Sequence, residues 1–489
     1  MPVISLIVLP SLAGLSAFVI RNDRLRRLLL VLTAFGHLSL SFLAVFDRPV
    51  AVPGEGWFAL DPLGALFLLI TSTLFAAVSV YAVGYLEREE PGERQDFVSS
   101  FLFVNAPEAV FTGCLLLFLA TMSMVTLSQH MGLLWVAVEA TTLTSAPLIY
   151  FHRHHRSLEA TWKYLLICSV GIAIALLGVF FLAVAASNQE IPLTMSGLAE
   201  HAQGLDPLWL KAAFIFLVVG YGTKMGLAPL NTWLPDAHSE SPSLVSALLS
   251  GALLNCAFLG ILRIFQVTSA ARIEPFGQDI LVVFGLVSMG VAAIFILGQV
   301  NYKRMLAYSS VEHMGILSLG VGLGGAGAFG AMLHAVNHSI TKAMLFMVAG
   351  NILTAYRTKS TLNVKGVLGA APVSGVLWIG GLFAITGSPP FGTFMSELSI
   401  LKAAMDQGNW IVTFFYLAFL AVIFMAMTSI GIKMAFGVSE DGDREPAVEP
   451  WLSTLPCMVL GVIVLFLGLY VPAGLATLID QAIRGLGFP

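Results

Sequence analysis

The sequence predicts an all-α integral membrane protein, and three features support this fold class. Of the 489 residues, 57% are hydrophobic and only 11% are charged, with a mean hydropathy of +0.89. A soluble domain usually carries about 25% charged residues, because its exterior needs polar cover. The apolar residues also gather in runs of about 20, which is long enough to span a bilayer. The connections between these runs are short, and no soluble domain fits between them.

The composition also excludes several other classes of protein. The net charge of −4 and the pI near 6.2 show no bias towards nucleic acid. No GxGxxG follows a strand pattern and no GxxxxGK[ST] is present, so no nucleotide site is indicated. We expect no bound cofactor or Fe–S cluster, because the four cysteines stand singly in apolar runs, as small buried hydrophobic residues do: Cys114, Cys168, Cys256 and Cys457.

The apolar runs predict about 14 membrane-spanning helices within a single membrane domain, residues 1–489. The first run lacks a basic segment before it and a cleavage site after it, so we interpret it as a retained helix rather than a signal peptide. The expected spans are 2–20, 27–46, 62–86, 108–128, 130–151, 160–186, 207–227, 243–266, 278–298, 304–322, 325–355, 372–404, 410–437 and 452–480.

Basic residues are concentrated in alternate connections. The connections after odd-numbered spans hold Arg21, Arg24, Arg26, Arg27, Arg88, Arg94, Arg153, Arg156, Lys303, Arg304, Arg357, Lys359, Lys365 and Arg444. The other connections hold few, chiefly Arg48, Arg272 and Arg484. Because cytoplasmic loops carry an excess of Lys and Arg, we expect both termini on the opposite side of the membrane. One span more or fewer would scatter these residues over both sides, which favours about 14 spans.

Two predicted spans, the seventh and the twelfth, contain similar interruptions. Residues 222–235 read GTKMGLAPLNTWLP, and residues 386–397 read TGSPPFGTFMSE. Proline removes a backbone donor and clashes with the preceding turn, so each helix is expected to break there. Broken backbone at membrane depth is tolerated only against protein or water. One such segment in each half of the chain is typical of repeated transporter halves around a path at the midplane, with a pair of incidental kinks as the alternative.

An ionisable side chain inside the bilayer is costly and is therefore retained mostly for function. Glu139 lies near the middle of the fifth span, and Lys224 lies just before the break in the seventh. Burial lowers the pKa of a lysine and a nearby carboxylate raises it, so the separation of such a pair can control a proton. A permanent structural ion pair is the alternative, although burying such a pair rarely adds net stability.

The eleventh span carries His334, His338 and Lys342 at successive intervals of four residues. These positions form one stripe along a helix, with Asn337 and Ser339 as polar neighbours. Histidine titrates near neutral pH, so two histidines followed by a lysine suit a proton relay. Metal binding by the two histidines is the competing interpretation. We expect no metal there, because no HExxH is present and no carboxylate on that helix completes a ligand set.

Further candidates surround these groups. Glu397 follows the break in the twelfth span and is interpreted as a proton exit, with a water-facing rim glutamate as the alternative. Lys163, at the start of the sixth span, is either a buried modulator of Glu139 or a lysine that reaches the membrane surface. Glu312 and His313 lie in the tenth span, where they can join the relay. Asp236, His238 and Glu240 follow the break in the seventh span, where they form either a proton uptake site or a solvated loop.

Two segments resemble a known family, the antiporter-like subunits of respiratory complex I, membrane-bound hydrogenases, formate hydrogenlyases and multi-subunit Na⁺/H⁺ antiporters. Residues 221–242, YGTKMGLAPLNTWLPDAHSESP, and residues 333–346, LHAVNHSITKAMLF, are similar to its signatures. The resemblance implies two inverted five-helix repeats, at 105–266 and 277–437, flanked by N-terminal helices in 1–104 and a last helix in 450–489. Two further segments, at 139–153 and 157–168, look most like the F subunits of hydrogenase-4.

The resemblance also implies roles for individual residues. Glu139 matches the fifth-helix glutamate of the family and Lys224 its seventh-helix lysine. Glu397 matches a twelfth-helix group that is lysine in some members. His334, His338 and Lys342 match the central relay. The chain departs from the family at Asn255, where many members have lysine or histidine. An amide neither takes up nor releases a proton at accessible pH, so the path there must use water or another group.

These patterns lead us to expect one proton-translocating subunit of a redox-driven complex in the cytoplasmic (inner) membrane of a bacterium or archaeon. The chain shows no redox centre, so its expected partners are further membrane subunits and a soluble redox arm. Three alternatives are a subunit of a multi-subunit Na⁺/H⁺ antiporter driven by ion gradients, a structural anchor whose proton path has degenerated at Asn255, and a transport-linked carbon dioxide hydration module.

Overall fold

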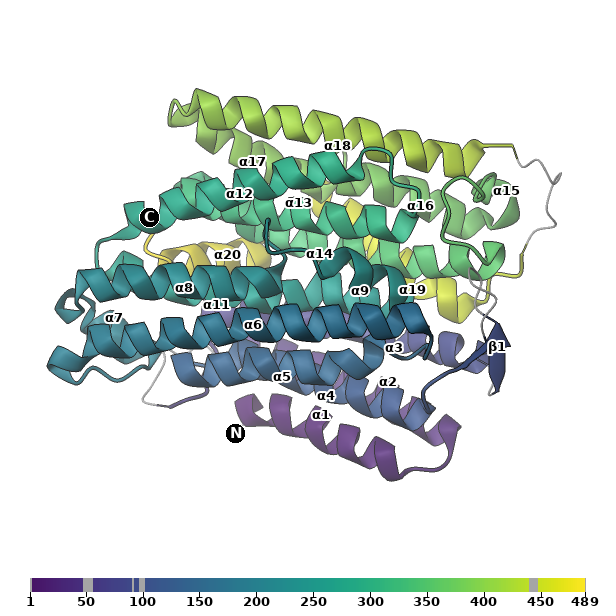
Figure 1. Cartoon of the computed structure of the whole chain (residues 1–489), viewed down its shortest axis with the longest axis horizontal. Coiled ribbons are helices and arrows are strands. Elements are labelled where there is room, and N and C mark those ends of the chain that lie inside the picture. Colours follow the sequence, from purple (N-terminus) through teal and green to yellow (C-terminus); the bar gives the residue numbers. More distant parts are fainter. Residues whose placement is uncertain (1, 47–55, 90–91, 96–101, 439–446, 489) are drawn as a thin grey trace.

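The computed structural model describes residues 2–46, 56–89, 92–95, 102–438 and 447–488. Long helices lie side by side and nearly parallel, which confirms the all-α class (Figure 1). The helices of the first half are α1 (Pro2–Val19), α2 (Asp23–Phe46), α3 (Pro62–Arg88), α4 (Glu108–Leu127), α5 (Met131–Ile149), α6 (His155–Ala186), α7 (Met195–Glu200), α8 (Pro207–Met225), α9 (Leu234–Glu240), α10 (Ser243–Leu248) and α11 (Leu254–Ala270).

The second half continues the same pattern. Its helices are α12 (Glu274–Ile296), α13 (Tyr302–Leu323), α14 (Gly325–Tyr356), α15 (Val367–Ala370), α16 (Pro372–Ile385), α17 (Gly392–Asp406), α18 (Trp410–Phe436), α19 (Trp451–Leu469) and α20 (Ala473–Gly485). A short antiparallel hairpin, β1 (Glu93–Gln95) and β2 (Leu102–Val104), lies at one end of the bundle.

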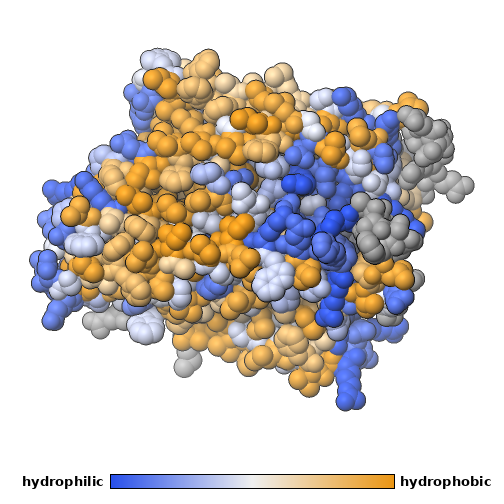
Figure 2. Space-filling view, viewed as in Figure 1, coloured by the Kyte–Doolittle hydropathy of each residue, from blue (hydrophilic) through white to orange (hydrophobic). Residues whose placement is uncertain are grey.

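The exterior of the bundle is apolar over its middle. Large hydrophobic side chains such as Ile411, Phe414 and Phe424 are exposed. Hydrophobic residues cover the middle of the face seen in Figure 2, and hydrophilic residues gather towards its ends. Ten of the described helices are long and apolar enough to cross a membrane by length and composition. Lipid is the solvent that suits such a surface, and the number of about 14 spans stays a prediction.

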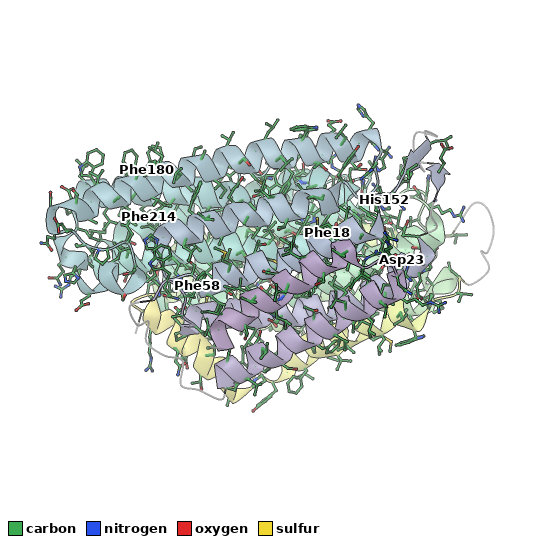
Figure 3. The ribbon with its side chains drawn as sticks, turned by 90° about the horizontal axis from the view of Figure 1, so that it is seen from below. Phe18, Asp23, Phe58, His152, Phe180 and Phe214 are labelled. Carbon is green, nitrogen blue, oxygen red and sulfur yellow. The ribbon has the colours of Figure 1, made fainter. Side chains whose placement is uncertain are left out.

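The connections alternate between the two ends of the bundle as the basic residues predict. Isolated backbone bridges join connections at the same end of the bundle. Phe58 pairs with Ser128, and His130 pairs with Thr194, which joins the connections after the second, fourth and sixth predicted spans. Asn105 pairs with His152, which joins those after the third and fifth spans, and Asn301 pairs with Ser360, which joins those after the ninth and eleventh. In Figure 3, Phe58 lies towards one end, and Asp23 and His152 lie at the other.

Both predicted breaks are present. The helix α8 ends at Met225, where Gly226 has a φ of 84°, and α9 begins at Leu234. The helix α16 ends at Ile385, and α17 begins at Gly392 after Gly387, with a φ of 66°. Glycine adopts these positive φ values without the steric cost of a Cβ. Each break therefore interrupts a span and leaves helix ends inside the protein.

Two parts of the fold differ from the expected spans. The last span, 452–480, is two helices, because α19 ends at Leu469 and α20 begins at Ala473 after Pro472. A proline suits the position before a helix and cannot continue the preceding one. The eighth span contains a π-helical segment, Leu249–Leu253, between α10 and α11. Such segments are rare and often occur at functional sites.

A buried ion pair joins α3 to α11 at the end opposite the hairpin. The guanidinium of Arg263 donates to both carboxylate oxygens of Asp61 at 2.6 Å, and both side chains are buried. Asp61 also caps α3 by accepting from the backbone N–H of Gly64. Burial opposes ionisation of Asp61, but the charge and hydrogen bonds of Arg263 outweigh it and hold the pKa of this carboxyl below its usual value.

Candidate functional site

The first group of ionisable residues is built around Lys224, which is completely buried at the end of α8. Its ammonium group donates to Thr142 Oγ1 at 2.7 Å and to Tyr164 OH at 2.6 Å. Thr142 donates in turn to Glu139 Oε2 at 3.3 Å, and Ser169 donates to Glu139 Oε1 at 2.9 Å. A hydroxyl therefore lies between the lysine and the glutamate, so the separation of the predicted pair is bridged by Thr142.

Glu139 is only partly buried, on the side of α5 that meets α6. Lys224, by contrast, has no exposed surface. Buried charges need hydrogen bonds, and the three hydroxyls of Thr142, Tyr164 and Ser169 supply them here. The arrangement can pass a change in charge at the partly exposed Glu139 to a fully buried ammonium group.

The second group is a cluster of three histidines, His313 from α13 with His334 and His338 from α14, all completely buried. His313 Nδ1 lies 2.8 Å from His334 Nε2, and the ring centroids of His313 and His338 are 4.9 Å apart. His334 Nδ1 lies 2.9 Å from Ser396 Oγ. We call this set the histidine cluster; it can carry protons between its rings because imidazole both donates and accepts.

Glu397 lies beside the histidine cluster on α17. His313, His334 and Glu397 bring three donor atoms within 4.8 Å of one another. Glu397 Oε1 has no hydrogen-bond partner among the described residues. The break makes room for this carboxylate, because a Cβ at Gly387 would overlap Glu397 Oε2. Glu397 also lines a cavity of about 350 Å³ between α17 and α18.

Buried polar side chains also join α11 to α14. Asn255 donates to Ser339 Oγ at 2.7 Å and to the carbonyl of Gly251 at 2.9 Å, next to the π-helical segment. Lys342 donates to the carbonyl of Leu306 at 2.7 Å. Ser339 and Lys342 lie on α14, the helix that carries His334 and His338, so Asn255 contacts α14 directly.

A polar cavity of about 440 Å³ lies among the connections that carry the basic residues. Its charged and titratable lining residues are Arg88, Glu89, His152, His154, Glu240, Lys303, Arg357 and Lys359. The Lys303 ammonium is buried and donates to the carbonyl of Ser241 at 2.6 Å. The cavity is large enough for several waters, so it can supply protons to the interior.

Comparison with known proteins assigns this arrangement to a family. The family described as "NADH:quinone oxidoreductase/Mrp antiporter, TM" matches residues 128–424. The chain belongs to this family. The resemblance inferred from the residue patterns is therefore confirmed, and the matched region holds both groups of ionisable residues, from Glu139 to Glu397.

Curated relatives of this antiporter-family chain cover nearly its whole length. The Hydrogenase-4 component F homolog of Methylacidiphilum infernorum (isolate V4) is 33% identical over 447 residues, which are 90% of each chain. The NADH-quinone oxidoreductase subunit N of Desulforudis audaxviator (strain MP104C) is 28% identical over 485 residues, 93% of this chain and 91% of the relative.

Solved structures show the same fold. A chain of the membrane-bound sulfane sulfur reductase, an archaeal respiratory membrane complex, superposes with a TM-score of 0.86 at 22% identity, covering 99% of this chain and 97% of that one. A chain of the Mrp complex from Dietzia sp. DQ12-45-1b gives a TM-score of 0.81 at 20% identity, with the same coverage. At these identities the likeness concerns the fold alone.

Some weaker candidates lie away from both groups. Lys163 in this antiporter-family chain is not buried; its side chain is 44% exposed and pairs with Glu159 at 2.7 Å and Asp236 at 3.0 Å. Arg304 also pairs with Asp236, at 3.3 Å. In this chain Lys163 therefore lies at the surface and pairs with Glu159 and Asp236 rather than with Glu139. Asp236 belongs to a surface ion-pair network, not to the lining of the polar cavity.

Glu240 and His238 occupy different environments. Glu240 lines the polar cavity and pairs with Lys359 at 3.0 Å. Burial opposes its ionisation, but the charges of Lys359 and Arg156 outweigh it and hold the pKa of Glu240 below its usual value. His238 is completely buried, stacks on Phe346 at 4.9 Å, and has no hydrogen-bond partner on either ring nitrogen within the described ranges.

Glu312 and His313 are both buried, but only His313 belongs to the histidine cluster, and Glu312 Oε2 accepts from Ser309 at 3.4 Å.

Sequence reasoning missed several residues. Thr142, Tyr164 and Ser169 are ordinary residues of apolar helices, and only their contacts reveal that they solvate Glu139 and Lys224. Lys303 was counted among the basic loop residues, but it lies in the first turn of α13 with its side chain buried. No local signal distinguished it from Lys163, which also stands at the start of an apolar span and is exposed.

Proposed function

We propose that the chain is a proton-translocating, antiporter-like membrane subunit of a larger redox-driven complex. The observation that carries the proposal is the pair of buried ionisable groups, one at Lys224 and one at the histidine cluster, inside the region matched by the family. The 33% identical hydrogenase-4 component F homolog, which aligns over 90% of its length, supports a hydrogenase-type assembly in particular.

The proposed mechanism is electrostatic. A change at a neighbouring subunit alters the charge at Glu139, which is the partly exposed member of the first group. Thr142 passes the change to Lys224, which then releases or takes up a proton. Desolvated charges interact strongly over such short distances, because little water screens them.

The released proton then needs a path to the second group. Asn255 and Ser339 join α11 to α14, the relay helix, and water held by the unpaired Asn255 Oδ1 can carry the proton to Lys342 and the histidine cluster. Glu397 is the exit group, because it contacts both the cluster and the cavity between α17 and α18. His238 and the polar cavity with Glu240 are the proposed uptake side.

The same proposal includes two inverted repeats, 105–266 and 277–437, between the flanking segments 1–104 and 450–489. The two breaks support it, because each falls in the fourth span of its repeat. Glu139 and Glu312, both in the second helix of a repeat, support it as well.

We further propose that the chain lies in the cytoplasmic membrane of a bacterium or archaeon with both termini outside the cytoplasm. The end of the bundle that carries the polar cavity holds most of the described basic residues, as cytoplasmic loops usually do. The proposed partners are neighbouring membrane subunits and a soluble redox arm, since the sequence carries no redox motif.

The test begins with the native complex, purified in mild detergent and analysed by mass spectrometry. Co-purifying hydrogenase or dehydrogenase subunits are the expected result, and they identify the electron donor for transport assays in inverted membrane vesicles. Lys224→Ala should abolish coupled proton transport in an assembled complex. The control is Lys211→Ala, an exposed lysine on the same helix.

Two outcomes would contradict the proposal. Intact proton transport in assembled Lys224→Ala complexes would exclude the route through this lysine. A partner set of small membrane proteins without redox subunits would favour an antiporter driven by ion gradients, for which the fold of the Mrp complex chain is the supporting observation. Sodium-dependent proton exchange would then be the next measurement.

A further inference from the structure

The contact between the histidine cluster and Glu397 has the composition of a metal site. His313, His334 and Glu397 come from three helices, are all buried, and bring one donor atom each to within 4.8 Å of the others. The sequence predicted no metal at these histidines, because the helix that carries His334 and His338 has no carboxylate to complete a ligand set. The carboxylate comes from α17 instead, beyond the break at Gly387.

The hydrogen bonds of His334 leave the correct nitrogen available. Ser396 Oγ lies 2.8 Å from the carbonyl of Thr393 and 2.9 Å from His334 Nδ1. When the hydroxyl donates to that carbonyl, it accepts from His334 Nδ1, and His334 Nε2 keeps its lone pair towards His313. Histidines that bind metals usually donate their other ring N–H in this way, which fixes the ring and its tautomer.

The distances suit a small ion after a small adjustment. Two nitrogens bound to tetrahedral Zn²⁺ at about 2.0–2.1 Å lie about 3.3 Å apart. His313 Nδ1 and His334 Nε2 are 2.8 Å apart, so an ion would replace their hydrogen bond after a separation of about half an ångström. The proton of that hydrogen bond would move to His313 Nε2, which has no partner among the described residues. Two imidazoles and one carboxylate form a ligand set that Zn²⁺ commonly takes, with a fourth position for water.

We propose that His313, His334 and Glu397 form a binding site for one Zn²⁺ ion. His338 is the nearest further donor, since its ring lies 4.9 Å from that of His313 and neither of its nitrogens has a partner in the described part of the chain. Borderline ligands of this kind favour Zn²⁺ over Mg²⁺ or Ca²⁺, which prefer oxygen alone.

The cavity between α17 and α18 borders the site at Glu397. It has a volume of about 350 Å³ and is lined by Gly387, Glu397 and Tyr416 together with apolar side chains of both helices. Glu397 Oε1 has no partner in the described residues, so it is available to an arriving cation. The carboxylate is the first charged ligand that an ion from this cavity meets, and the imidazoles lie behind it.

Occupation of the site would block the proton path, because the ion takes the lone pairs that the relay uses. This effect rests on the proposed function, whereas the binding site itself does not. Zinc should therefore act as a reversible inhibitor of transport, relieved by a chelator.

The experiment measures zinc binding to the purified native complex, stripped of metals and titrated with Zn²⁺ alone. Equilibrium dialysis gives the number of ions per chain, and X-ray absorption identifies imidazole and carboxylate ligands. We expect His313→Gln and Glu397→Gln each to remove one bound ion per complex or to lower the affinity for Zn²⁺ by about tenfold or more. Even the loss of a residue that only hydrogen-bonds to a metal ligand typically lowers metal affinity by about this much. The control is His37→Gln, a buried histidine of α2 that bonds Ser123 and Ser72.

The possible outcomes test the zinc site and the proposed proton transport independently of each other. Equal zinc binding by the wild type and by both cluster variants would overturn the site, as would the absence of any ion with imidazole ligands. Loss of the ion in the two cluster variants, with retention in His37→Gln, would establish it whether or not the complex transports protons. If the wild-type complex transports protons and saturating zinc leaves the rate unchanged, the proposed block is wrong although the site exists.

Discussion

The ammonium nitrogen of Lys224 lies 2.7 Å from the hydroxyl oxygen of Thr142, which in turn donates to Glu139. One hydroxyl therefore joins the buried lysine to the partly exposed glutamate. A hydroxyl both accepts and donates, so it can transmit a change in charge while it keeps the two groups apart. The strength of coupling between Glu139 and Lys224 then depends on a residue that has no charge of its own.

Thr142→Val should uncouple the two charges. Valine has nearly the shape of threonine but cannot bond Lys224, and a hydrogen bond to a charged group contributes about 1.5–3 kcal/mol. We expect proton transport in inverted vesicles to fall by about tenfold or more, since about 1.4 kcal/mol corresponds to tenfold. Thr141→Val is the matched control, because its hydroxyl donates only to the carbonyl of Val138 among its described contacts. Equal rates in the two variants would contradict the role of Thr142.

Gly387→Ala should displace the exit carboxylate. A Cβ at this position would overlap Glu397 Oε2, and the φ of 66° is strained for any residue with a side chain. We expect an assembled complex whose transport is largely lost. Gly380→Ala, in the preceding helix α16, adds a Cβ with no heavy atom within 4 Å and should leave transport unchanged. Full transport by the Gly387 variant would show that the position of Glu397 is unimportant.

Asp61→Asn should destabilise the fold by leaving Arg263 buried without its counter-charge. Removing one partner of a buried ion pair costs about 3–5 kcal/mol. The measurement is the apparent Tm in detergent, with Asp480→Asn, an exposed aspartate on α20, as the control. A variant with the wild-type Tm at pH 7 would show that the pair adds nothing to stability.

The same variant tests the pH dependence of this pair. Because the pKa of Asp61 is lowered in the folded state, its contribution is fully present above the unfolded pKa of about 3.9 and is lost as the pH falls through the folded value. The Tm difference between wild type and Asp61→Asn should therefore be constant at neutral pH and shrink below about pH 4. A difference that grew on acidification would have the wrong sign.

Asn255→Leu should slow transport at the junction between the two groups. The amide bonds Ser339 on the relay helix, and its Oδ1 is buried without a partner in the described chain, so it can orient a water. We expect the rate of proton transport to fall by about tenfold, because one lost hydrogen bond costs about 1 kcal/mol and about 1.4 kcal/mol corresponds to tenfold. Thr268→Val on the same helix is the control, since the Thr268 hydroxyl donates to the carbonyl of Phe265. An unchanged rate for Asn255→Leu would move the path elsewhere.

Several features of the site were predictable from single residues. Glu139, Lys224, His334, His338 and Glu397 were identified because an ionisable group in an apolar run has few structural explanations. Their neighbours were not identifiable in this way. Thr142 and Tyr164 are common in such helices, so nothing local distinguishes the hydroxyls that bind Lys224 from those that bond their own helix.

Charged residues near helix ends were the least predictable. Lys163 and Lys303 both stand at the start of an apolar span, yet Lys163 is 44% exposed whereas Lys303 is buried beneath Ser241. Depth in the bundle depends on which neighbouring connection covers the helix end. The covering segments here, around Glu240 and Lys359, are distant in sequence from the residues that they cover.

The sequence by itself determined that the protein is helical, that lipid surrounds it, and that two of its helices are broken, because hydropathy and the backbone chemistry of proline and glycine act locally. Its short motifs also determined the family. Only the tertiary structure decided which side chains meet: the hydroxyl between Lys224 and Glu139, the salt link of Asp61 to Arg263, and the approach of Glu397 to His313 and His334. These contacts join helices far apart in the chain, and a periodic pattern along one helix carries no information about which neighbour it faces.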